Sequence, residues 1–511
     1  MGRKKIERLF SKTVALGLVA ALGLGATGIG EVAASETASE EVSQESESND
    51  SYSYDAADYD SERIANNYTK VSAGYTLPVY EKEAVEISTV AAVTDAGDAK
   101  ETSETRDYEK SDKVLDLTTG NTITLQIEVP EDGQYVMNFD YLSYDESILP
   151  INLGLKVDGS YPFYECRTLE FETTWEPDPE PSYDRYDNQV VTVPNKVIQW
   201  ESKYLMDSSY RHSSPLKLEL TKGTHEIELE VKEGTFLLGN LTLEAPTEVE
   251  AYTGSEKAEG SALIELQGEG YSRTNSSSVH GIAEYDTSLD PYETTDTVLN
   301  TIDSDSFGTA GQQISYDFTV EEAGYYYIAM NYRQSDKTDF PVFLDVAIDG
   351  EIPNTAFQSY GMAYTTKYKT TTLSDEDGNY LSVYLEKGTH TISYTISMDE
   401  ICYIMEALDE VMSDVNDLAL EITKVAGTNS DKYRDLKLSR YIPNLEKNLY
   451  GYADRLSELE QSALQWSNSS KNVAVMSSML IAAEQLRSLA NNPDEIPYLS
   501  LIHISEPTRL R

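Results

Sequence analysis

The sequence predicts a mainly β fold with an α-helical C-terminal part: two tandem β-sandwiches followed by an antiparallel helical bundle. A stretch that begins at Val129 (VPEDGQYVMNFDY) recurs at Val320 (VEEAGYYYIAMNY), an offset of 191 residues. A second match pairs LTKGTHEIEL from Leu220 with LEKGTHTISY from Leu385, an offset of 165, so the first copy carries 191 − 165, about 26, extra residues. From Ile401 the apolar period becomes helical. Self-similarity at a fixed period indicates one folded unit used twice.

The N-terminal residues resemble an export signal followed by a tether. Residues 1–34 have a basic start, an apolar stretch from Thr13 to Ile29 and a small-residue site at Val32-Ala33-Ala34, which predicts a secretory signal peptide. A permanent membrane anchor is the alternative, but the stretch is short and glycine-rich for a spanning helix. Residues 35–82 are acidic, serine-rich and poor in aliphatic side chains, which predicts a disordered tether.

Alternating apolar residues predict the strands of both sandwiches. In the first, residues 83–246, AVEIST from Ala84 and NTITLQIEV from Asn121 alternate apolar and polar positions. The second, residues 261–400, follows a linker at 247–260. After the turn that ends at Gly133, and at the equivalent Gly324, we expect a glycine with positive φ. The apolar period-two positions are Tyr135, Met137, Phe139 and Tyr141 in the first copy and Tyr326, Ile328, Met330 and Tyr332 in the second.

Residues 401–498 change to heptad-like spacing. Three stripes of apolar residues, from Ile401, Leu445 and Val475, alternate steps of four and three, and Gly427 ends the first stripe. Three such stripes joined by short loops predict an antiparallel three-helix bundle with an apolar core and no chemistry of its own. Residues 499–511 are expected to be an artefact, because LSLIHISEPTR from Leu499 resembles a translated sequencing adapter; the natural protein would then continue past Tyr498.

Charge and cysteine content limit the function classes. The chain has 39 basic and 89 acidic residues, a net charge of −50, which repels phosphate backbones and argues against nucleic acid and anionic membranes. Neutral sugars and divalent cations remain compatible. The two cysteines, Cys166 and Cys402, have no disulfide spacing and are expected to be buried small hydrophobes. A secretion signal with almost no cysteine predicts a protein secreted to the cell surface of a Gram-positive bacterium.

Longer segments of the second copy resemble a known family. LNTIDSDSFGTAGQQISYDFTVEEAGYYYIAMNYRQ, VFLDVAIDGEIP and LEKGTHTISY are similar to family-6 and family-35 carbohydrate-binding modules, which are galactose-binding-like jelly rolls. With GTNSDKYRDLKLSRYIPNLEKNL and ANNPDEIP, the order of features over residues 83–498 resembles the N-terminal half of large extracellular solute-binding proteins of Firmicutes. The resemblance implies two jelly rolls and a bundle ahead of a solute-binding domain that serves an ABC importer, with its permease as a partner.

Aromatic side chains in loops are the candidate sugar contacts, because flat apolar faces stack on the C–H surfaces of sugars. Asn275, Asn354 and Gln358 are possible partners for hydroxyl groups, and Tyr186 and Tyr204 are further aromatics of the first copy. An individual tyrosine can equally stand on an exposed strand face. The predicted ligand-binding residues are Trp175, Tyr183, Trp200, Tyr271, Tyr285, Tyr292, Tyr360, Tyr364 and Tyr368.

The chain is expected to need no cofactor and to be no enzyme. Related modules often hold calcium through a Glu-x-Glu pair, but Glu265-Leu266-Gln267 and Glu86-Ile87-Ser88 each lack the second acid, so calcium is only a possibility. His225 and His390 recur in the Gly-Thr-His turn of both copies, which favours a structural role. No nucleophile motif, phosphate loop or metal-ligand spacing appears in the sequence.

Three functions therefore stay open. The leading interpretation is a non-catalytic secreted receptor fragment that captures carbohydrate for an ABC importer. The second is the accessory part of a truncated glycoside hydrolase, because the same modules flank such enzymes. The third is a structural cell-surface stalk whose sandwiches bind no ligand.

Overall fold

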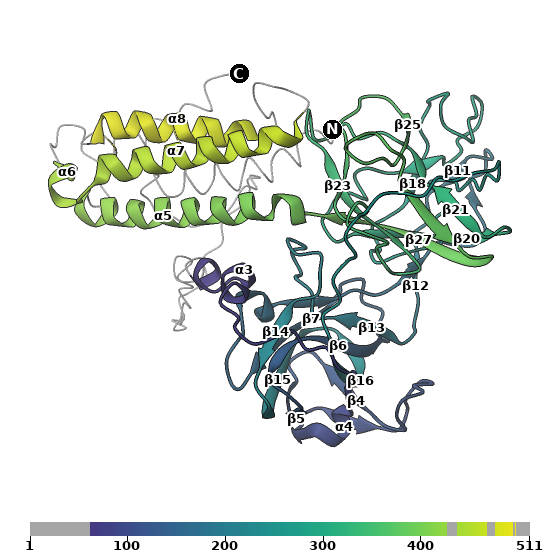
Figure 1. Cartoon of the computed structure of the whole chain (residues 1–511), viewed down its shortest axis with the longest axis horizontal. Helices are drawn as coiled ribbons and strands as arrows, with labels where there is room; N and C mark the ends of the chain where they lie inside the picture. The colour runs from purple at the N-terminus through teal and green to yellow at the C-terminus, as the bar shows by residue number, and fades with distance from the viewer. Residues whose placement is uncertain (1–61, 427–436, 468–475, 494–495, 497–511) are drawn as a thin grey trace, which may run out of the picture. The chain divides into compact units, whose positions relative to one another are not determined.

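The computed structural model describes residues 62–426, 437–467, 476–493 and 496 (Figure 1). They form two compact units. Of the described residues, the sandwich unit contains 66–403 and 466–467, and the helical unit contains 62–65, 404–426, 437–465, 476–493 and 496. The predicted signal peptide, most of the predicted tether and the adapter-like tail lie outside the described residues. No helix in the described part of the chain is long and apolar enough to cross a membrane.

The first copy is a sandwich of two antiparallel sheets. One sheet has the order β13-β6-β16-β4-β3, with β14 also on β6 and β1 on β16; the other has the order β2-β5-β15-β7-β8. The first sheet contains β1 (Val85–Ile87), β3 (Lys100–Thr102), β4 (Val114–Thr118), β6 (Gly133–Ser143), β13 (Glu201–Tyr204), β14 (Lys217–Leu220) and β16 (Thr235–Glu244). The second contains β2 (Val93–Asp95), β5 (Thr122–Val129), β7 (Ile151–Val157), β8 (Leu169–Phe171) and β15 (Gly223–Glu233).

The period-two residues of β6 form the centre of this first core. Tyr135, Met137 and Phe139 have no exposed surface, and Tyr141 is 2% exposed. They pack with alternate residues of β5, such as Leu125, in one cluster that spans both sheets. Burying each of these large side chains stabilises the fold by roughly 1.5–3 kcal/mol relative to exposing it. The alternation therefore fixes which face of each strand points inward.

The second copy has its own sheet and core. The sheet order is β12-β9-β17-β20-β27-β23-β24, and the pairs β21–β26, β22–β25 and β18–β19 stand beside it. Its own strands are β17 (Arg273–Thr274), β18 (Gly281–Ile282), β19 (Thr301–Ile302), β20 (Gln313–Val320), β21 (Gly324–Tyr327), β22 (Ala329–Tyr332), β23 (Val342–Ile348), β24 (Tyr360–Met362), β25 (Lys369–Thr372), β26 (Ser382–Leu385) and β27 (Gly388–Ser397). Phe357 and Leu373 are fully buried in this second core.

Strand pairing confirms that one unit is used twice. β6 pairs with β14 so that Gly133 faces Leu220 and Gln134 faces Glu219. β21 pairs with β26 in the same register, with Gly324 opposite Leu385 and Tyr325 opposite Tyr384. These are the residues that the offsets of 191 and 165 relate, so the repeat extends from sequence to hydrogen-bonding register.

The expected positive φ after the repeated turn is wrong for Gly133 and Gly324. Neither glycine lies in the left-handed region. The glycines with positive φ are instead Gly159 (φ 80°) in the first copy and Gly350 (φ 86°) in the second. The surroundings of Gly133 are tight instead: an added Cβ would lie 3.3 Å from the Tyr135 ring and 3.4 Å from the carbonyl oxygen of Pro78. A period-two pattern of apolar residues does not report the backbone conformation of the glycine in the turn before it.

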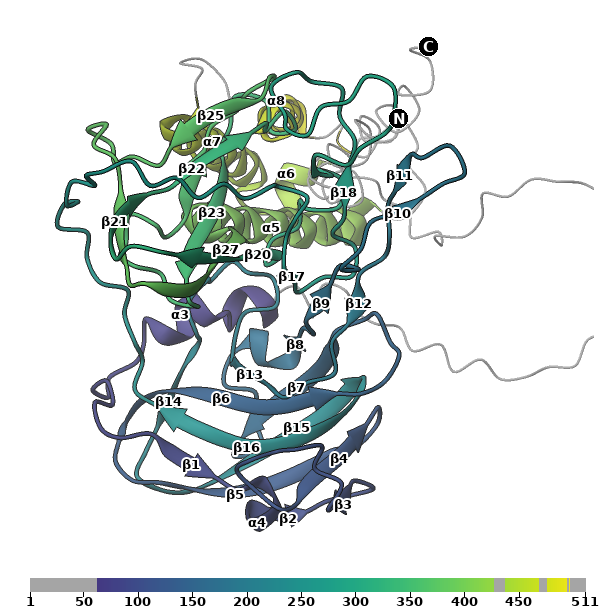
Figure 2. The ribbon, with the colours of Figure 1, turned by 90° about the vertical axis from the view of Figure 1, so that its right-hand side faces the viewer.

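The extra segment of the first copy reaches into the sheet of the second. β9 (Trp175–Glu176) pairs with β12 (Asn195–Lys196), and Trp175 also pairs with Thr274 of β17. Figure 2 shows β9 and β12 beside β17. Within the same segment β10 (Ser182–Tyr183) pairs with β11 (Gln189–Val190), and the Gln189 N–H donates to Thr297 O at 2.8 Å. Two strands from the extra segment of the first copy therefore complete the sheet of the second sandwich.

The described end of the predicted tether is ordered, contrary to prediction. α3 (Tyr68–Ser72) is capped by Asn67, whose side chain accepts the N–H of Lys70 at 3.0 Å. Tyr68 packs against Phe163 with ring centroids 5.0 Å apart, and Tyr80 is 6% exposed in the first core. The composition predicted disorder because the segment is rich in serine and acidic residues. Three of its tyrosines, Tyr68, Tyr75 and Tyr80, are nevertheless partly or fully buried. The remaining short helices are α4 (Thr89–Ala92), η2 (Tyr164–Arg167) and η3 (Asp399–Ile401).

The helical unit follows the predicted stripes. α5 (Cys402–Ala426), α7 (Leu445–Ala463) and α8 (Ser477–Asn491) lie side by side in Figure 1, with the short α6 (Leu438–Tyr441) before α7 and η4 (Leu464–Trp466) after it. The stripes form the core: Leu408 and Val415 on α5, Leu449 and Leu456 on α7, and Leu486 on α8 are all buried. The predicted fold class, β-sandwiches followed by helices, is confirmed.

Candidate functional site

Loops at one end of the second copy bring an arginine and a tyrosine together. β22 pairs with β25 so that Tyr332 faces Lys369. The next residues outward, Arg333 and Tyr368, therefore meet at the end of the strand pair. The Arg333 guanidinium lies 4.7 Å from the centroid of the Tyr368 ring, a cation–π contact.

A third loop adds a carboxylate. Arg333 Nη2 lies 2.7 Å from Glu284 Oε1. The Glu284 N–H donates to Asn300 Oδ1 at 2.9 Å, and Asn300 Nδ2 donates to the carbonyl oxygens of Glu284 and Pro291. Because Asn300 is 6% exposed, its buried amide fixes the loop that carries Glu284. Tyr285, the next residue, is 69% exposed. Glu284, Tyr285, Arg333 and Tyr368 are called the loop cluster below.

The electrostatics of the loop cluster keep its groups in defined states. The hydrogen bond to Glu284 raises the pKa of Arg333 further above its already high value, so the guanidinium stays charged. Burial raises the pKa of Tyr368, so its phenol stays neutral. A held guanidinium–carboxylate pair offers donors and acceptors in fixed positions, and Tyr285, the exposed residue that follows Glu284, offers an apolar face. That combination suits a neutral polyhydroxyl ligand.

The predicted aromatics of the second copy differ in exposure. Tyr292 shares the loop of Glu284 and is 37% exposed, and Tyr364 is half-buried in the loop before Tyr368. The hydroxyl of Tyr360 accepts the Ser374 N–H at 3.2 Å, and its ring packs on the second core. Tyr271 is 4% exposed and donates to Val279 O at 2.9 Å. The structure therefore brings Tyr285, Tyr292, Tyr364 and Tyr368 to neighbouring loops and places Tyr271 in the core.

The predicted residues of the first copy do not gather at one place. Trp175 is 5% exposed in β9, where it pairs with the second copy's sheet. Trp200 is half-buried; its Nε1 donates to Thr105 O at 2.9 Å and its ring lies 4.2 Å from that of Tyr108. Tyr183 is 58% exposed in β10. Trp175 and Trp200 thus make contacts within the protein, and only Tyr183 of these three predicted residues is largely exposed.

The possible hydroxyl partners and the calcium candidates also have internal contacts. Asn275 Nδ2 donates to Gly311 O at 2.8 Å, and Asn354 Oδ1 accepts the Ala356 N–H at 3.0 Å. Glu86 Oε1 accepts Asn240 Nδ2 at 2.9 Å, so this carboxylate is bound by an amide. Glu265 lies outside the described strands.

Sequence reasoning missed the polar members of the loop cluster, Glu284 and Arg333, together with Asn331, which donates to Ser288 O at 2.9 Å. One signal was present. Arg333 directly follows the period-two run that ends at Tyr332, and a charged residue at a strand end is positioned for a loop site. Glu284 had no such signal, because it is one of 89 acidic residues.

The repeated Gly-Thr-His turn forms the same contact in both copies. His225 Nδ1 lies 2.7 Å from Asp158 Oδ2, and His390 Nδ1 lies 2.7 Å from Asp349 Oδ2. Each Nε2 lies 2.8 Å from a main-chain carbonyl oxygen, of Thr221 and Glu386 respectively. Both aspartates have φ of 51° and belong to the equivalent Asp-Gly turns. These histidines hold turns, as the recurrence predicted.

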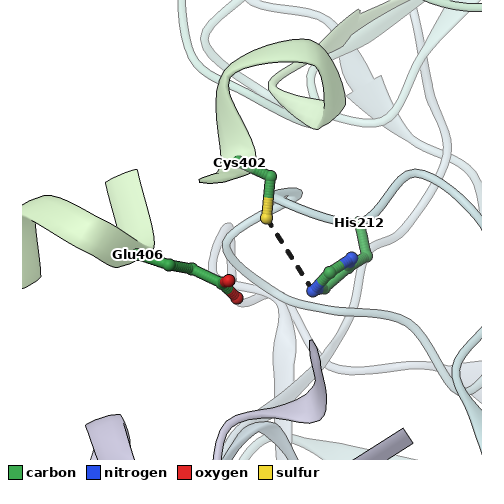
Figure 3. A group of neighbouring side chains, drawn as sticks. All are labelled: His212, Cys402 and Glu406. Carbon is green, nitrogen blue, oxygen red and sulfur yellow. Dashed lines mark hydrogen bonds between the residues drawn. The ribbon is translucent and has the colours of Figure 1, made fainter. Parts of the chain in front are cut away.

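A histidine and a cysteine approach each other elsewhere in the sandwich unit. Figure 3 draws His212 and Cys402 of this unit and Glu406, which belongs to the helical unit. Cys402 Sγ lies 3.9 Å from His212 Nε2, which is also 3.2 Å from Thr69 Oγ1. A thiol and an imidazole are metal-ligand types, but two donors fall short of the four that a structural zinc site uses. Both cysteines are buried and neither forms a disulfide.

Comparisons with known proteins match separate parts of the chain. The model of the family described as "Bacterial solute-binding protein, 4-helix bundle domain" matches residues 403–506. No curated protein matches the sequence. Among solved structures, the C-terminal family-6 carbohydrate-binding module of a marine laminarinase from Zobellia galactanivorans is similar at 10% identity and a TM-score of 0.20, covering 32% of this chain and 98% of that one.

Two further structures give similar values. A family-6 module of lichenase 5A from Cellvibrio mixtus, solved with cellotriose, has 13% identity and a TM-score of 0.20, covering 32% of this chain and 98% of that one. A family-35 module from Clostridium thermocellum has 11% identity and a TM-score of 0.21, covering 32% and 99%. These identities and TM-scores are too low to assign a function to this chain.

Proposed function

We propose that this chain is a secreted, non-catalytic carbohydrate-binding part of a bacterial solute receptor, and that the loop cluster of its second sandwich holds the sugar. The observation that carries the proposal is the fixed Arg333–Glu284 pair, with the exposed Tyr285 next to Glu284 in the chain. The match of residues 403–506 to a solute-binding bundle supports the receptor context.

A neutral sugar is the ligand class that fits this chemistry. Sugar hydroxyls both donate and accept, so they can bond to the guanidinium N–H groups and to the carboxylate oxygens at once. Tyr285 offers a flat face for the C–H side of a pyranose ring. Anionic ligands are disfavoured by the net charge of −50. Tyr292, Tyr364 and Tyr368 are proposed to line the same site.

The receptor context is itself a proposal. The bundle at 401–498 would join the two modules, 83–246 and 261–400, to a solute-binding domain encoded beyond the adapter-like tail. That domain would deliver solute to an ABC permease in the membrane of a Firmicutes cell. Sequencing the natural gene through Leu499 and beyond tests this: a two-lobed α/β domain supports the receptor, and a (β/α)₈ barrel supports an accessory part of a hydrolase.

A glycan array followed by titration calorimetry tests the ligand. The full chain is expected to bind a neutral glycan, and Tyr285→Ala to weaken that binding by about tenfold, because one stacked ring is lost. Tyr441→Ala is the matched control, since this tyrosine is 64% exposed on α6 in the helical unit. Equal binding by both variants, or no binding to any neutral glycan, would contradict the proposal.

One observation favours the stalk as a second candidate. Trp175 and Trp200, the indole rings predicted to stack on sugar in the first copy, are used in contacts within the protein. The first sandwich would then serve as a rigid spacer for the second. In that case, Tyr183→Ala leaves every glycan affinity unchanged.

A further inference from the structure

Four tyrosines form an exposed surface on β21, on β26 and in the loop that precedes β26. Tyr325 and Tyr384 are cross-strand partners with ring centroids 5.2 Å apart, and Tyr327 and Tyr380 form a second edge-to-face pair at 5.4 Å. Their exposed fractions are 42%, 53%, 37% and 54% in that order. Tyr325, Tyr327, Tyr380 and Tyr384 are called the tyrosine platform below.

The first copy shows that this fold does not require tyrosines here. The residues equivalent to Tyr325, Tyr327 and Tyr384 are Gln134, Val136 and Glu219. They are covered by the chain itself: Gln134 N–H donates to Pro78 O at 2.9 Å, and Glu219 Oε1 accepts the Leu77 N–H at 2.7 Å. In the second copy the linker donates only the Ala258 N–H to Tyr327 Oη, at 3.1 Å, and leaves the four rings exposed.

The platform continues the line of the loop cluster. Alternate residues of one strand face the same way, so Tyr325, Tyr327, Ala329, Asn331 and Arg333 share the outer face of β21 and β22. Eight residues separate Tyr325 from Arg333, which corresponds to about 26 Å along an extended strand. This distance is several sugar units long. Between the two sites Ala329 has a small side chain, and Asn331 Nδ2 donates to Ser288 O at 2.9 Å, so the loop of Glu284 reaches this face next to Arg333.

Area and charge identify the occupant. Together the four rings expose about as much surface as two whole tyrosines, on the order of 400 Å². A stable protein partner buries about 800 Å² on each side, so the platform is small for a second copy or another protein. Exposed Glu321, Glu322 and Glu386 flank it and repel polyanions.

We propose that the tyrosine platform extends the loop cluster into one track for an extended chain, so that the ligand is a neutral polysaccharide rather than a single sugar. The inference rests on the proposed function, because the loop cluster holds one end of the chain. Sugar rings would lie against the tyrosine faces, and the Arg333–Glu284 pair would fix the position of the chain by its hydroxyls.

Calorimetry with a length series tests the track. The probes are neutral β-linked gluco-, manno- and xylo-oligosaccharides from disaccharide to octasaccharide, titrated into the full chain. Affinity is expected to rise with length, and the double variant Tyr325→Thr and Tyr384→Thr to lower octasaccharide affinity by about tenfold while leaving the disaccharide value unchanged. Threonine keeps the strand propensity. The control is Tyr441→Thr, a tyrosine 64% exposed on α6 in the helical unit.

The outcomes separate the two proposals. Binding of short sugars with no gain in affinity with length, or an unchanged octasaccharide affinity in the platform variant, overturns the track and leaves the loop site standing. A platform variant that instead abolishes a concentration-dependent dimer in sedimentation also overturns it, because the occupant is then a second copy. Absence of binding to every oligosaccharide overturns the loop site as well. Equal thermal unfolding of the variant and the parent confirms that the fold is intact.

Discussion

At the residue scale, the aspartate–histidine pair is the most informative contact, because it occurs in both copies, as Asp158–His225 and as Asp349–His390. Burial alone would raise the pKa of Asp349, but the hydrogen bonds from His390 and from the Thr391 N–H outweigh it and lower that pKa. The bond to Asp349 raises the pKa of His390 in turn. The same opposite shifts hold for Asp158 and His225. Each pair therefore ties a strand end to a neighbouring turn through charge.

The pairs predict a pH window of stability. The raised pKa of His390 means that its contribution is complete below 6.5 and lost as the pH rises through the folded value. The lowered pKa of Asp349 means that its contribution is complete above 3.8 and lost as the pH falls. His390→Gln should reduce the free energy of unfolding between these values, by up to about 1 kcal/mol at a partly exposed pair, and flatten its decline above pH 6.5.

Chemical denaturation at a series of pH values measures this effect. Lys387→Gln is the control, since its ammonium group is 69% exposed and 3.5 Å from Glu321. If His390→Gln and Lys387→Gln have the same pH profile, the histidine does not hold the turn by charge.

Two glycines of the second copy give a matched test of backbone conformation. Gly350 has φ of 86° with no atom near an added Cβ, and Gly324 also has open space but no positive φ. Gly350→Ala should lower the free energy of unfolding by about 1 kcal/mol, because L-residues are disfavoured in the left-handed region. Gly324→Ala should be neutral or stabilising by up to about 1 kcal/mol, because it restricts the unfolded chain. Equal effects in urea titrations would refute this distinction.

At the element scale, the extra segment of the first copy is the feature that most changes the picture of two separate modules. β9 and β12 add to the sheet of the second copy, and Tyr210 from the same copy covers Gly311, where an added Cβ would lie 2.1 Å from the ring. Asn188 Oδ1 accepts the Thr297 N–H at 2.9 Å. These contacts hold the loop that leads to Asn300 and hence to the loop cluster.

Trp175 and Tyr183 belong to this segment and should behave differently. Trp175→Ala removes a large side chain that is 5% exposed and should lower the free energy of unfolding by roughly 3–5 kcal/mol. Tyr183→Ala changes a side chain that is 58% exposed and should stay within about 0.5 kcal/mol of the parent. Denaturant titrations compare the two. A small effect of Trp175→Ala would mean that β9 does not belong to the second sheet.

Local patterns predicted the elements well where one face of each is buried. The period-two residues of β6 and the four-three stripe of α7 have that property, and both formed as predicted. α3 was missed because the region is acidic and serine-rich overall, and because the partner of Tyr68, Phe163, lies 95 residues away.

The candidate site was only partly predictable. Tyr285 and Tyr368 follow from the chemistry of sugar binding, but nothing local relates Arg333 to Glu284, which lies 49 residues away. Trp175 could not be distinguished from a ligand contact, because its burial depends on a strand pair between the two copies. Pairing over long sequence separations is decided by the tertiary fold, which local periodicity does not report.

At the scale of the whole molecule, the extra segment of the first copy predicts that both sandwiches unfold together, because its strands β9 and β12 belong to the sheet of the second copy. Amide protons of β6 in the first copy and β20 in the second should therefore exchange with the same opening free energy. Hydrogen-exchange mass spectrometry on the full chain measures both. In Trp175→Ala the two values should separate; values that already differ in the parent chain would show two independent sandwiches.

A crystal structure of the full chain with its best-binding oligosaccharide tests whether the second sandwich holds a neutral glycan at the loop cluster. We expect a sugar ring against Tyr285, with hydroxyl groups bonded to Arg333 and Glu284. Sugar density on the first sandwich alone, or at a distance from these three residues, would contradict it.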